Sequence, residues 1–193
     1  MNLVKEVYAE VKAWTGLRTL LTAADDDRIV VSANMKVGAY VIAAQPSAPS
    51  RLGFKVTAAG AADTMGIITV IGKDINRRTV TEIVTPIAGS TVYTNTYFMT
   101  VDSITGSGWV ISEGNDTIIV GVLASAGIEC RGCSMDLKVI TGNVWVNPKT
   151  TAVADDTSIP LSVGDVYSST VKDVLSIISD AAGATFHAIV WEE

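Results

Sequence analysis

The sequence predicts an all-β protein, built as one or two antiparallel β-sandwich (jelly-roll-like) units that follow an N-terminal amphipathic helix and arm. Short runs rich in Ile, Val and Thr recur at intervals of about ten residues from residue 52 onward. Gly, Asn, Asp and Ser separate these runs, a pattern typical of sandwiches and barrels. With 48% hydrophobic and 18% charged residues among 193, the chain can bury a core and is not expected to be disordered.

Residues 1–50 are predicted to form a helix and an extended docking arm. Apolar side chains recur at spacings of three and four from residue 3 to residue 21, with charged residues between them, which predicts an amphipathic helix bent near Gly16. This helix either packs on its own domain or docks on another subunit. The Pro- and Ser-rich stretch 45–50 reads as a linker. The predicted interface side chains on the helix are Leu3, Val7, Val11, Trp14, Leu17 and Leu21.

Residues 51–124 are predicted to form the first β unit. Its clearest element is the hairpin 66–86, in which two apolar, Thr-rich runs flank the polar connection 73–78. Asn76 in this connection tolerates a positive φ. Alternation places Val80, Glu82 and Val84 on one face of the second strand, whereas both faces of the first strand are largely apolar. The strands expected in this unit cover 52–58, 66–72, 79–85, 97–105, 109–113 and 117–123.

Residues 125–193 are predicted to form the second β unit, either separate from the first or continuous with it. The Ala-Ser-Ala-Gly run at 124–127 is the best candidate for the boundary. In the last strand, Thr185, His187, Ile189 and Trp191 share one face, and a strand this apolar on both faces belongs inside a sheet or at an interface. Trp191 is therefore added to the predicted interface. The strands expected here lie within 134–140, 142–148, 158–168, 173–180 and 183–193.

Charge and hydropathy argue against two classes of partner. The net charge of −6 removes the electrostatic reason to expect nucleic-acid binding. The sequence contains no run of about 18 apolar residues, so no membrane span is expected. Residues 1–14 carry charges throughout and lack the apolar core of a signal peptide, so the protein is expected to stay in the compartment where it is made.

No catalytic residue, cofactor or metal site is predicted, and the chain is therefore not expected to be an enzyme. Cys130 and Cys133 form one Cys-x-x-Cys pair, too few ligands for tetrahedral zinc, and favour a tight β turn. His187 is the only histidine and lies in an apolar strand, with no Gly-x-Ser-x-Gly motif elsewhere. The acidic runs 25–27 and 155–156 match no calcium loop and are interpreted as solvated loops.

Two stretches resemble known proteins. Residues 66–108, with "ITVIGKD", "TVTE", "GSTVYT" and "FMTVDSIT", resemble a β module of virion proteins from tailed bacteriophages. Residues 142–192, with "LSIISDAAGAT" and a terminal "IVW", are similar to a C-terminal module of such proteins. The resemblance extends over residues 52–193. The sequence departs from it where Arg77-Arg78 stands in place of a turn glycine.

The resemblance implies a non-enzymatic virion component of the capsid decoration (cement) type, located on the capsid surface and made in the host cytoplasm. The implied partners are the major capsid protein or neck proteins, and a homo-oligomer, by analogy a trimer, is expected. The alternative is a head fibre, neck or tail module that binds a host glycan or receptor. An exposed Trp109 or Trp145 beside a groove would favour that alternative.

Overall fold

The computed structural model describes residues 16–20, 24–60, 62–111, 116–129, 133–172 and 174–192. Within these residues the protein is nearly all β, with several antiparallel sheets and no α-helix, which confirms the predicted all-β class. The single helical element described is a 3₁₀ turn, Met35–Val37. The strands are β1 Gly16–Thr19, β2 Asp25–Asn34, β3 Ser50–Thr57, β4 Ile67–Lys73, β5 Thr79–Val84, β6 Thr91–Tyr93, β7 Thr100–Ser107, β8 Thr117–Glu129, β9 Cys133–Thr141, β10 Val144–Asn147, β11 Ile159–Leu161, β12 Val166–Val171, β13 Val174–Ser179 and β14 Thr185–Glu192.

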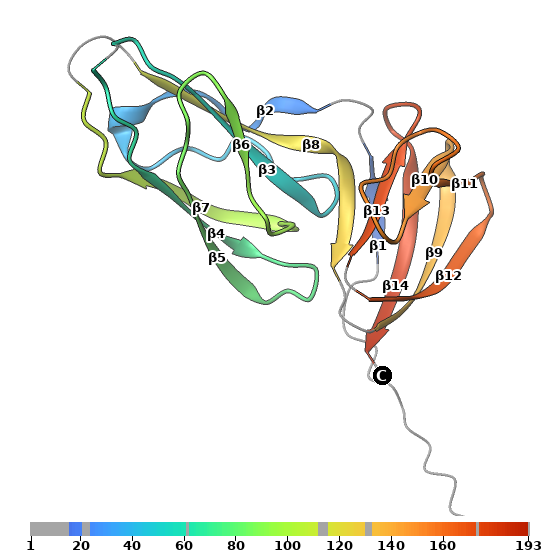
Figure 1. The fold of residues 1–193 in the computed structure, drawn as a ribbon. Coiled ribbons are helices and arrows are strands. Elements are labelled where there is room, and N and C mark those ends of the chain that lie inside the picture. Colours follow the sequence, from blue (N-terminus) through green and yellow to red (C-terminus); the bar gives the residue numbers. More distant parts are fainter. Residues whose placement is uncertain are drawn as a thin grey trace, which may run out of the picture.

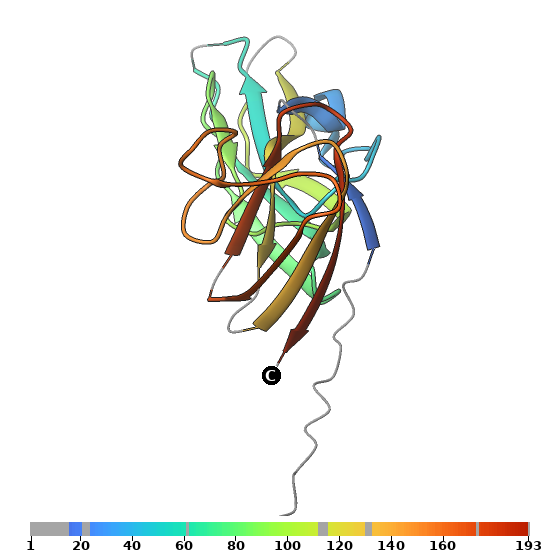
Figure 2. The same cartoon turned by 90° about the vertical axis from the view of Figure 1, so that its right-hand side faces the viewer.

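The strands form three sheets arranged as two lobes (Figure 1). The largest has the order β11-β10-β13-β8-β3-β6, with β2 also paired to β8; a second has the order β1-β14-β9-β12, and a third the order β5-β4-β7. The first lobe contains β2 to β7 and the start of β8. The second lobe contains β1, the end of β8 and β9 to β14. Figure 2, which views the molecule from the side of the second lobe, shows β14 in dark red beside the tan β9 as it runs to the C-terminus.

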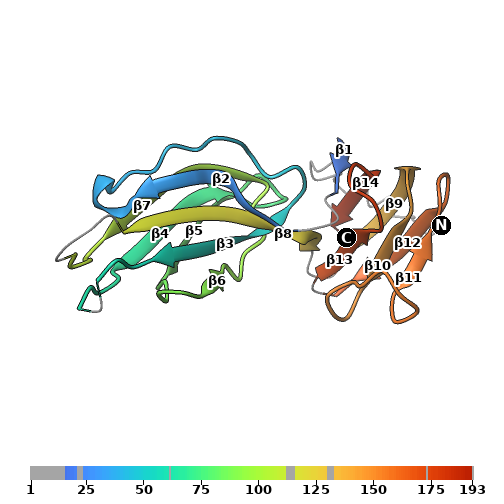
Figure 3. The same ribbon diagram turned by 90° about the horizontal axis from the view of Figure 1, so that it is seen from above.

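Strand β8 belongs to both lobes and connects them without a linker, as the view from above shows (Figure 3). Its 13 residues span roughly 43 Å at about 3.3 Å per residue, long for a strand. Ile118, Val120 and Val122 lie in the core of the first lobe, whereas Ala126 and Ile128 lie in the core of the second. The run 124–127, where the sequence placed a boundary, is therefore where one continuous strand passes from one core to the other.

The core of the first lobe lies between the three-stranded sheet and the β2-β8-β3-β6 part of the large sheet. Alternation along β4 and β5 turns Ile68, Val70 and Val84 inward and leaves Thr79, Thr81 and Ile83 exposed, as predicted for this hairpin. Aromatic residues Phe54 and Phe98 fill the centre and are fully buried.

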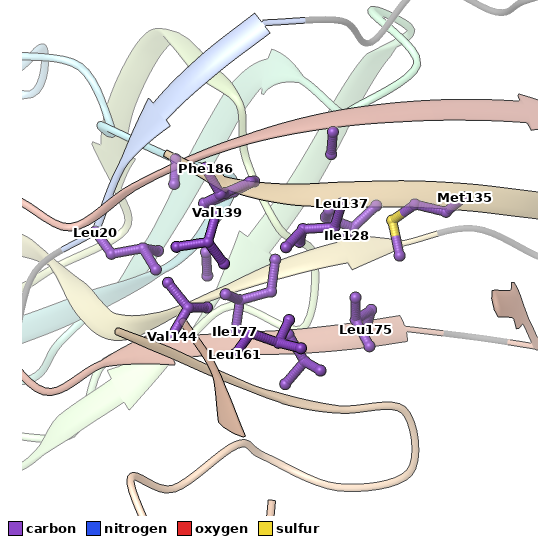
Figure 4. Packing of buried hydrophobic residues seen from close by; sticks show 14 of the residues in the cluster. Leu20, Ile128, Met135, Leu137, Val139, Val144, Leu161, Leu175, Ile177 and Phe186 are labelled. Atoms are coloured by element: carbon purple, nitrogen blue, oxygen red, sulfur yellow. The ribbon is translucent and has the colours of Figure 1, made fainter. Parts of the chain in front are cut away.

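The second core lies between the β1-β14-β9-β12 sheet and the β11-β10-β13-β8 part of the large sheet (Figure 4). Close packing of branched side chains from both sheets excludes water here, which supplies the main stabilisation of such a lobe. The buried side chains labelled in Figure 4 are Leu20, Ile128, Met135, Leu137, Val139, Val144, Leu161, Leu175, Ile177 and Phe186.

The β4–β5 hairpin of the first lobe reaches the second core. Ile75, at its tip, is 2% exposed and packs in the core of the second lobe. Two backbone hydrogen bonds close the tip, from Asp74 to the carbonyl of Arg78 and from Arg77 to the carbonyl of Asp74 (both 3.0 Å). The positive φ expected at Asn76 falls instead on Arg77, at 60°, because the Asp74 carboxylate also accepts from the Arg78 amide and fixes the end of the turn.

The predicted N-terminal helix is wrong over residues 16–19, which form β1. This strand pairs with β14, with Leu17 opposite His187 and Thr19 opposite Thr185. Gly16 and Thr19 are poor helix formers, and pairing with a long strand satisfies their backbone groups. Leu20, also within the predicted helix, is not helical and is buried in the second core, while the rest of that helix, including Leu3, Val7, Val11, Trp14 and Leu21, lies outside the described residues.

Residues 24–50, interpreted from the sequence as an extended docking arm, contribute to the first lobe. Strand β2 pairs with β8, and its Ile29 and Val30 are buried in the core. Met35 and Tyr40 follow them into that core, where the Tyr40 hydroxyl donates to the carbonyl of Met35 at 3.0 Å. Deleting residues 1–50 would therefore remove part of the core together with any arm.

Candidate functional site

The structure places two of the predicted interface residues, both on the β1-β14-β9-β12 sheet. Leu17 lies on β1, and Trp191 lies on β14 opposite Ser134. Trp191 is half-buried on the outer face, together with His187 and Ile189, while Phe186 and Val190 point into the core. The alternation predicted for the last strand is confirmed, and Trp191 is on the surface face of the sheet.

His187 shares this outer face with polar side chains of β9 and β12. Its cross-strand neighbours are Leu17 and Lys138. On the same face, the hydroxyl of Ser168 on β12 donates to the carboxylate of Asp136 on β9 at 2.5 Å.

The acidic runs have local roles. Asp25 forms an ion pair with Arg28 (3.6 Å) at the start of β2. Asp155 accepts hydrogen bonds from the hydroxyl and amide of Thr157, which lower the pKa of its carboxyl. Among the residues that the structure describes, no group of three or more His, Cys, Asp or Glu side chains could hold a metal ion. Cys130 lies outside that set.

The outer face of the three-stranded sheet is the first candidate binding surface, and we call it the Thr–Ile face. Cross-strand pairs such as Thr69–Ile83 and Ile71–Ser103 bring hydroxyl and aliphatic side chains side by side. Ile83 is 61% exposed and Ile67 is 40% exposed, so large apolar groups meet solvent here. Lys73 lies at its end, and Asp102, exposed on β7 at the register shift beside Ser103, lines the same hollow as Lys73. The face consists of Ile67, Thr69, Ile71, Lys73, Thr79, Thr81, Ile83, Ser103, Thr105 and Ser107.

Glu82, on the edge strand β5 of this sheet, holds the loop that follows β6. Its two carboxylate oxygens accept from the backbone amides of Asn95 (2.7 Å) and Thr96 (2.9 Å). Charge-assisted hydrogen bonds of this kind are stronger than neutral ones. They fix the loop that leads to Tyr97, the aromatic residue at the junction of the lobes.

A groove of about 500 Å³ at that junction is the second candidate surface. Tyr97 lines it from the first lobe, and the loop 148–151 with Lys172 lines it from the second lobe. Val174 and Ser176 of β13 complete the lining. Hydroxyl groups, an aromatic ring and two ammonium groups therefore converge on one hollow.

A third hollow, of about 520 Å³, lies beside the hairpin tip and has mixed charge. Lys73 and Arg77 line it together with Asp74 and Asp102. Arg18 is close enough to Arg77 for the two charges to interact, and burial, followed by this repulsion, lowers the pKa of Arg18. The guanidinium of Arg18 also contacts the sulfur of Met99 at 3.9 Å. Because both signs of charge are present, this hollow indicates no single class of ligand.

Two tryptophans named as indicators of a glycan platform do not form one. Trp109 packs against the first core and lies over Gly106, whose missing Cβ makes room for its ring. Trp145 lies in β10 between Pro160 and Ile178 on the neighbouring strands. Sequence reasoning missed Tyr97 and the Thr–Ile face. The signal for the face was present, since both faces of β4 are apolar although only one can turn toward the first core.

Comparison of the chain with protein-family models, with curated proteins and with solved structures finds no match. Within the described part of the chain, no helix has the length and apolarity of a membrane span. The functional argument therefore depends on the surfaces described above.

Proposed function

We propose that the protein is a non-enzymatic virion structural protein that binds the assembled phage capsid and stabilises it, with each lobe acting as a β-sandwich unit. The Thr–Ile face is the observation that supports this most. It is rich in exposed Ile, Thr and Ser, and its charged neighbours Lys73 and Asp102 lie at one end. Such a face suits contact with another protein surface, since it offers apolar area and hydroxyl groups without the desolvation cost of buried charges.

The size of this face favours repeated attachment over a single tight contact. Three strands about 4.8 Å apart, with seven residues of about 3.3 Å each, cover roughly 300 Å². A stable interface needs about 800 Å² on each partner. One copy would therefore bind weakly through this face, and several copies joined to one another would bind strongly through avidity. This reasoning favours a homo-oligomer on a repeating lattice, and a trimer is the symmetry we propose.

Binding of this kind stabilises a shell through mass action. A protein that binds the assembled lattice, and not its dissociated subunits, disfavours rupture by the free energy of the occupied sites. On this proposal the partners are the major capsid protein or neck proteins, and the protein is located on the capsid surface after synthesis in the host cytoplasm. The resemblance of residues 66–108 and 142–192 to virion modules points to the same role.

Co-sedimentation tests this proposal directly. Purified protein is mixed with undecorated shells of the phage that encodes it, and pelleting and heat resistance of the shells are measured. The wild-type protein should pellet with the shells and raise the temperature at which they rupture. Ile83→Asp, which places a charge on the Thr–Ile face, should abolish pelleting while the protein stays folded. The matched control is Val163→Asp, at a side chain 62% exposed in the second lobe, which should pellet normally.

Two outcomes would contradict the proposal. If the wild-type protein does not pellet with the shells, the decoration role is wrong. If Ile83→Asp pellets as well as the wild type, the Thr–Ile face is not the docking surface. Deletion of residues 1–15 separately tests the interface predicted on Leu3, Val7, Val11 and Trp14, because it keeps β1 and every core residue that the structure describes.

A further inference from the structure

The groove at the junction of the lobes has walls that are fixed in place. Asn147 begins the loop on one side, where its side-chain oxygen accepts from the amides of Lys149 (2.9 Å) and Thr150 (3.0 Å). Its amide nitrogen donates to the carbonyl of Thr157 at 3.2 Å. The amide of Ala152 then donates to the hydroxyl of Ser176 at 3.0 Å. The loop is thus held at both ends before any ligand arrives, which lowers the entropy cost of binding.

The aromatic wall is set by a glycine. A Cβ atom on Gly127 would lie 2.1 Å from Cε1 of Tyr97, so the ring lies flush against the backbone of β8. The Tyr97 side chain is half-buried and lines the groove together with the loop. An aromatic ring that is half-covered and rigid offers a stacking surface for the C–H face of a sugar ring.

Two lysines give the described lining of the groove a positive charge, opposite in sign to the net charge of the molecule. Lys149 and Lys172 are exposed, and neither has an ion-pair partner among the residues that the structure describes. They lie together in a protein whose net charge is −6. The exposed Thr150 and Thr151 add hydroxyl groups that can both donate and accept. The hollow is within the size range of small-molecule sites and larger than one sugar ring requires.

We propose that this groove binds an acidic oligosaccharide, with a sugar ring stacked on Tyr97 and a carboxylate held between Lys149 and Lys172. The aromatic wall, the hydroxyl groups and the paired ammonium groups each match one part of such a ligand. This site lies away from the Thr–Ile face and adds a function to the one proposed above. A protein that decorates a particle could in this way also attach it to a surface that carries acidic glycans.

The experiment is a titration of the full-length chain, labelled with ¹⁵N, followed by amide chemical shifts. The probe is a hyaluronan tetrasaccharide, which alternates glucuronate with N-acetylglucosamine. Cellotetraose serves as the neutral sugar and sodium acetate as the bare carboxylate. The hyaluronan fragment should shift the amides of Lys149, Thr150, Thr151 and Lys172, and added salt should weaken its binding.

Variants assign the two halves of the recognition. The double variant Lys149→Gln/Lys172→Gln should lower affinity for the hyaluronan fragment by about tenfold or more, since each ammonium contributes a charge-assisted hydrogen bond. The control Lys55→Gln/Lys138→Gln makes the same change in net charge at two exposed lysines elsewhere and should bind as the wild type does. Tyr97→Leu should weaken binding by about tenfold and Tyr97→Phe by much less, because the phenylalanine keeps the stacking ring.

Several results would overturn the proposal. If the groove amides do not shift at probe concentrations up to about 20 mM, far above the Kd of a specific site, the groove does not bind acidic oligosaccharides. Equal binding of cellotetraose would remove the role of the lysines. Acetate that shifts the same amides with the same affinity would reduce the groove to a simple anion site. Failure of capsid binding would leave this result untouched, so the two proposals fail separately.

Discussion

Removing the side chain of Ile75 should loosen the second lobe, although this residue belongs to a hairpin of the first. Ile75→Ala removes three carbons from a side chain that is 2% exposed, worth about 2.4 kcal/mol at about 0.8 kcal/mol for each group. The cavity term adds to this, because the closed hairpin tip cannot collapse into the space. We expect a loss of about 3 kcal/mol, and a fall in Tm of roughly 6 to 12 °C for a chain of this length.

Hydrogen exchange measured by mass spectrometry locates the effect. Amides of β9, β13 and β14 should exchange roughly a hundredfold faster in Ile75→Ala, the change in opening equilibrium that about 3 kcal/mol corresponds to. The control is Ile83→Ala on the same hairpin, where the side chain is 61% exposed and the loss should stay within about 0.5 kcal/mol. If exchange in the second lobe changes less than about threefold, the hairpin tip does not hold that lobe and the reasoning is wrong.

Three further perturbations test other contacts. Glu82→Gln should lower the free energy of unfolding in urea by about 1 to 3 kcal/mol, because an amide cannot accept from both Asn95 and Thr96. The control Asp102→Asn, at an exposed side chain of β7, should change this free energy little. Burial raises the pKa of Tyr40 to about 12 from 10.0. The stability that the neutral Tyr40 side chain contributes to the fold is therefore complete below pH 10 and is lost as pH rises to about 12. Tyrosinate absorbance should show this late ionisation in the wild type and not in Tyr40→Phe; an ordinary titration of all tyrosines would contradict it. Gly72→Ala should lower the free energy of unfolding by about 1 to 3 kcal/mol, because the added Cβ would lie 2.2 Å from the carbonyl oxygen of Thr100 across the β4–β7 pair. The control Thr105→Ala on the same sheet should have the Tm of the wild type.

The hairpin 66–86 was predictable because its information is local. Alternation along β5 and a polar connection with Asp74 and Asn76 specify two strands and a turn without reference to the rest of the chain. The turn itself was less predictable. A positive φ at Arg77 is unusual for a residue with a Cβ, and it arises from the hydrogen bonds that Asp74 makes around it.

The helix expected up to residue 21 shows where local periodicity fails. Trp14, Leu17 and Leu21 follow the helical spacing of three and four. Residues 16–19 instead form backbone hydrogen bonds with β14 at the other end of the chain. Tertiary pairing of this kind routinely overrides a weak helix preference. The partner of Leu17 is His187, 170 residues further along the chain, and no window of sequence that short-range patterns use contains both.

The groove could not be predicted for a related reason. Tyr97, Gly127 and Lys149 come from three separate stretches, and their meeting depends on how the two lobes are arranged. A glycine inside the apolar strand β8 was a visible signal of close approach, but the sequence did not say what approaches it. The Thr–Ile face was easier to predict, because the outward-facing residues of β4 follow once its inward-facing residues are known.

Strand β8, which both lobes share, supports the groove at their junction. Because β8 runs through both lobes, Tyr97 of the first lobe can pack on Gly127 of the same strand that carries Ile128 into the second core. The groove is thus built on a continuous hydrogen-bonded element, and Ile75 holds the lobes at a second point. Two separate attachments oppose a hinge at the junction. A groove that spans two lobes can keep a fixed shape only under that condition, so loosening Ile75 should weaken oligosaccharide binding even though Ile75 does not line the groove.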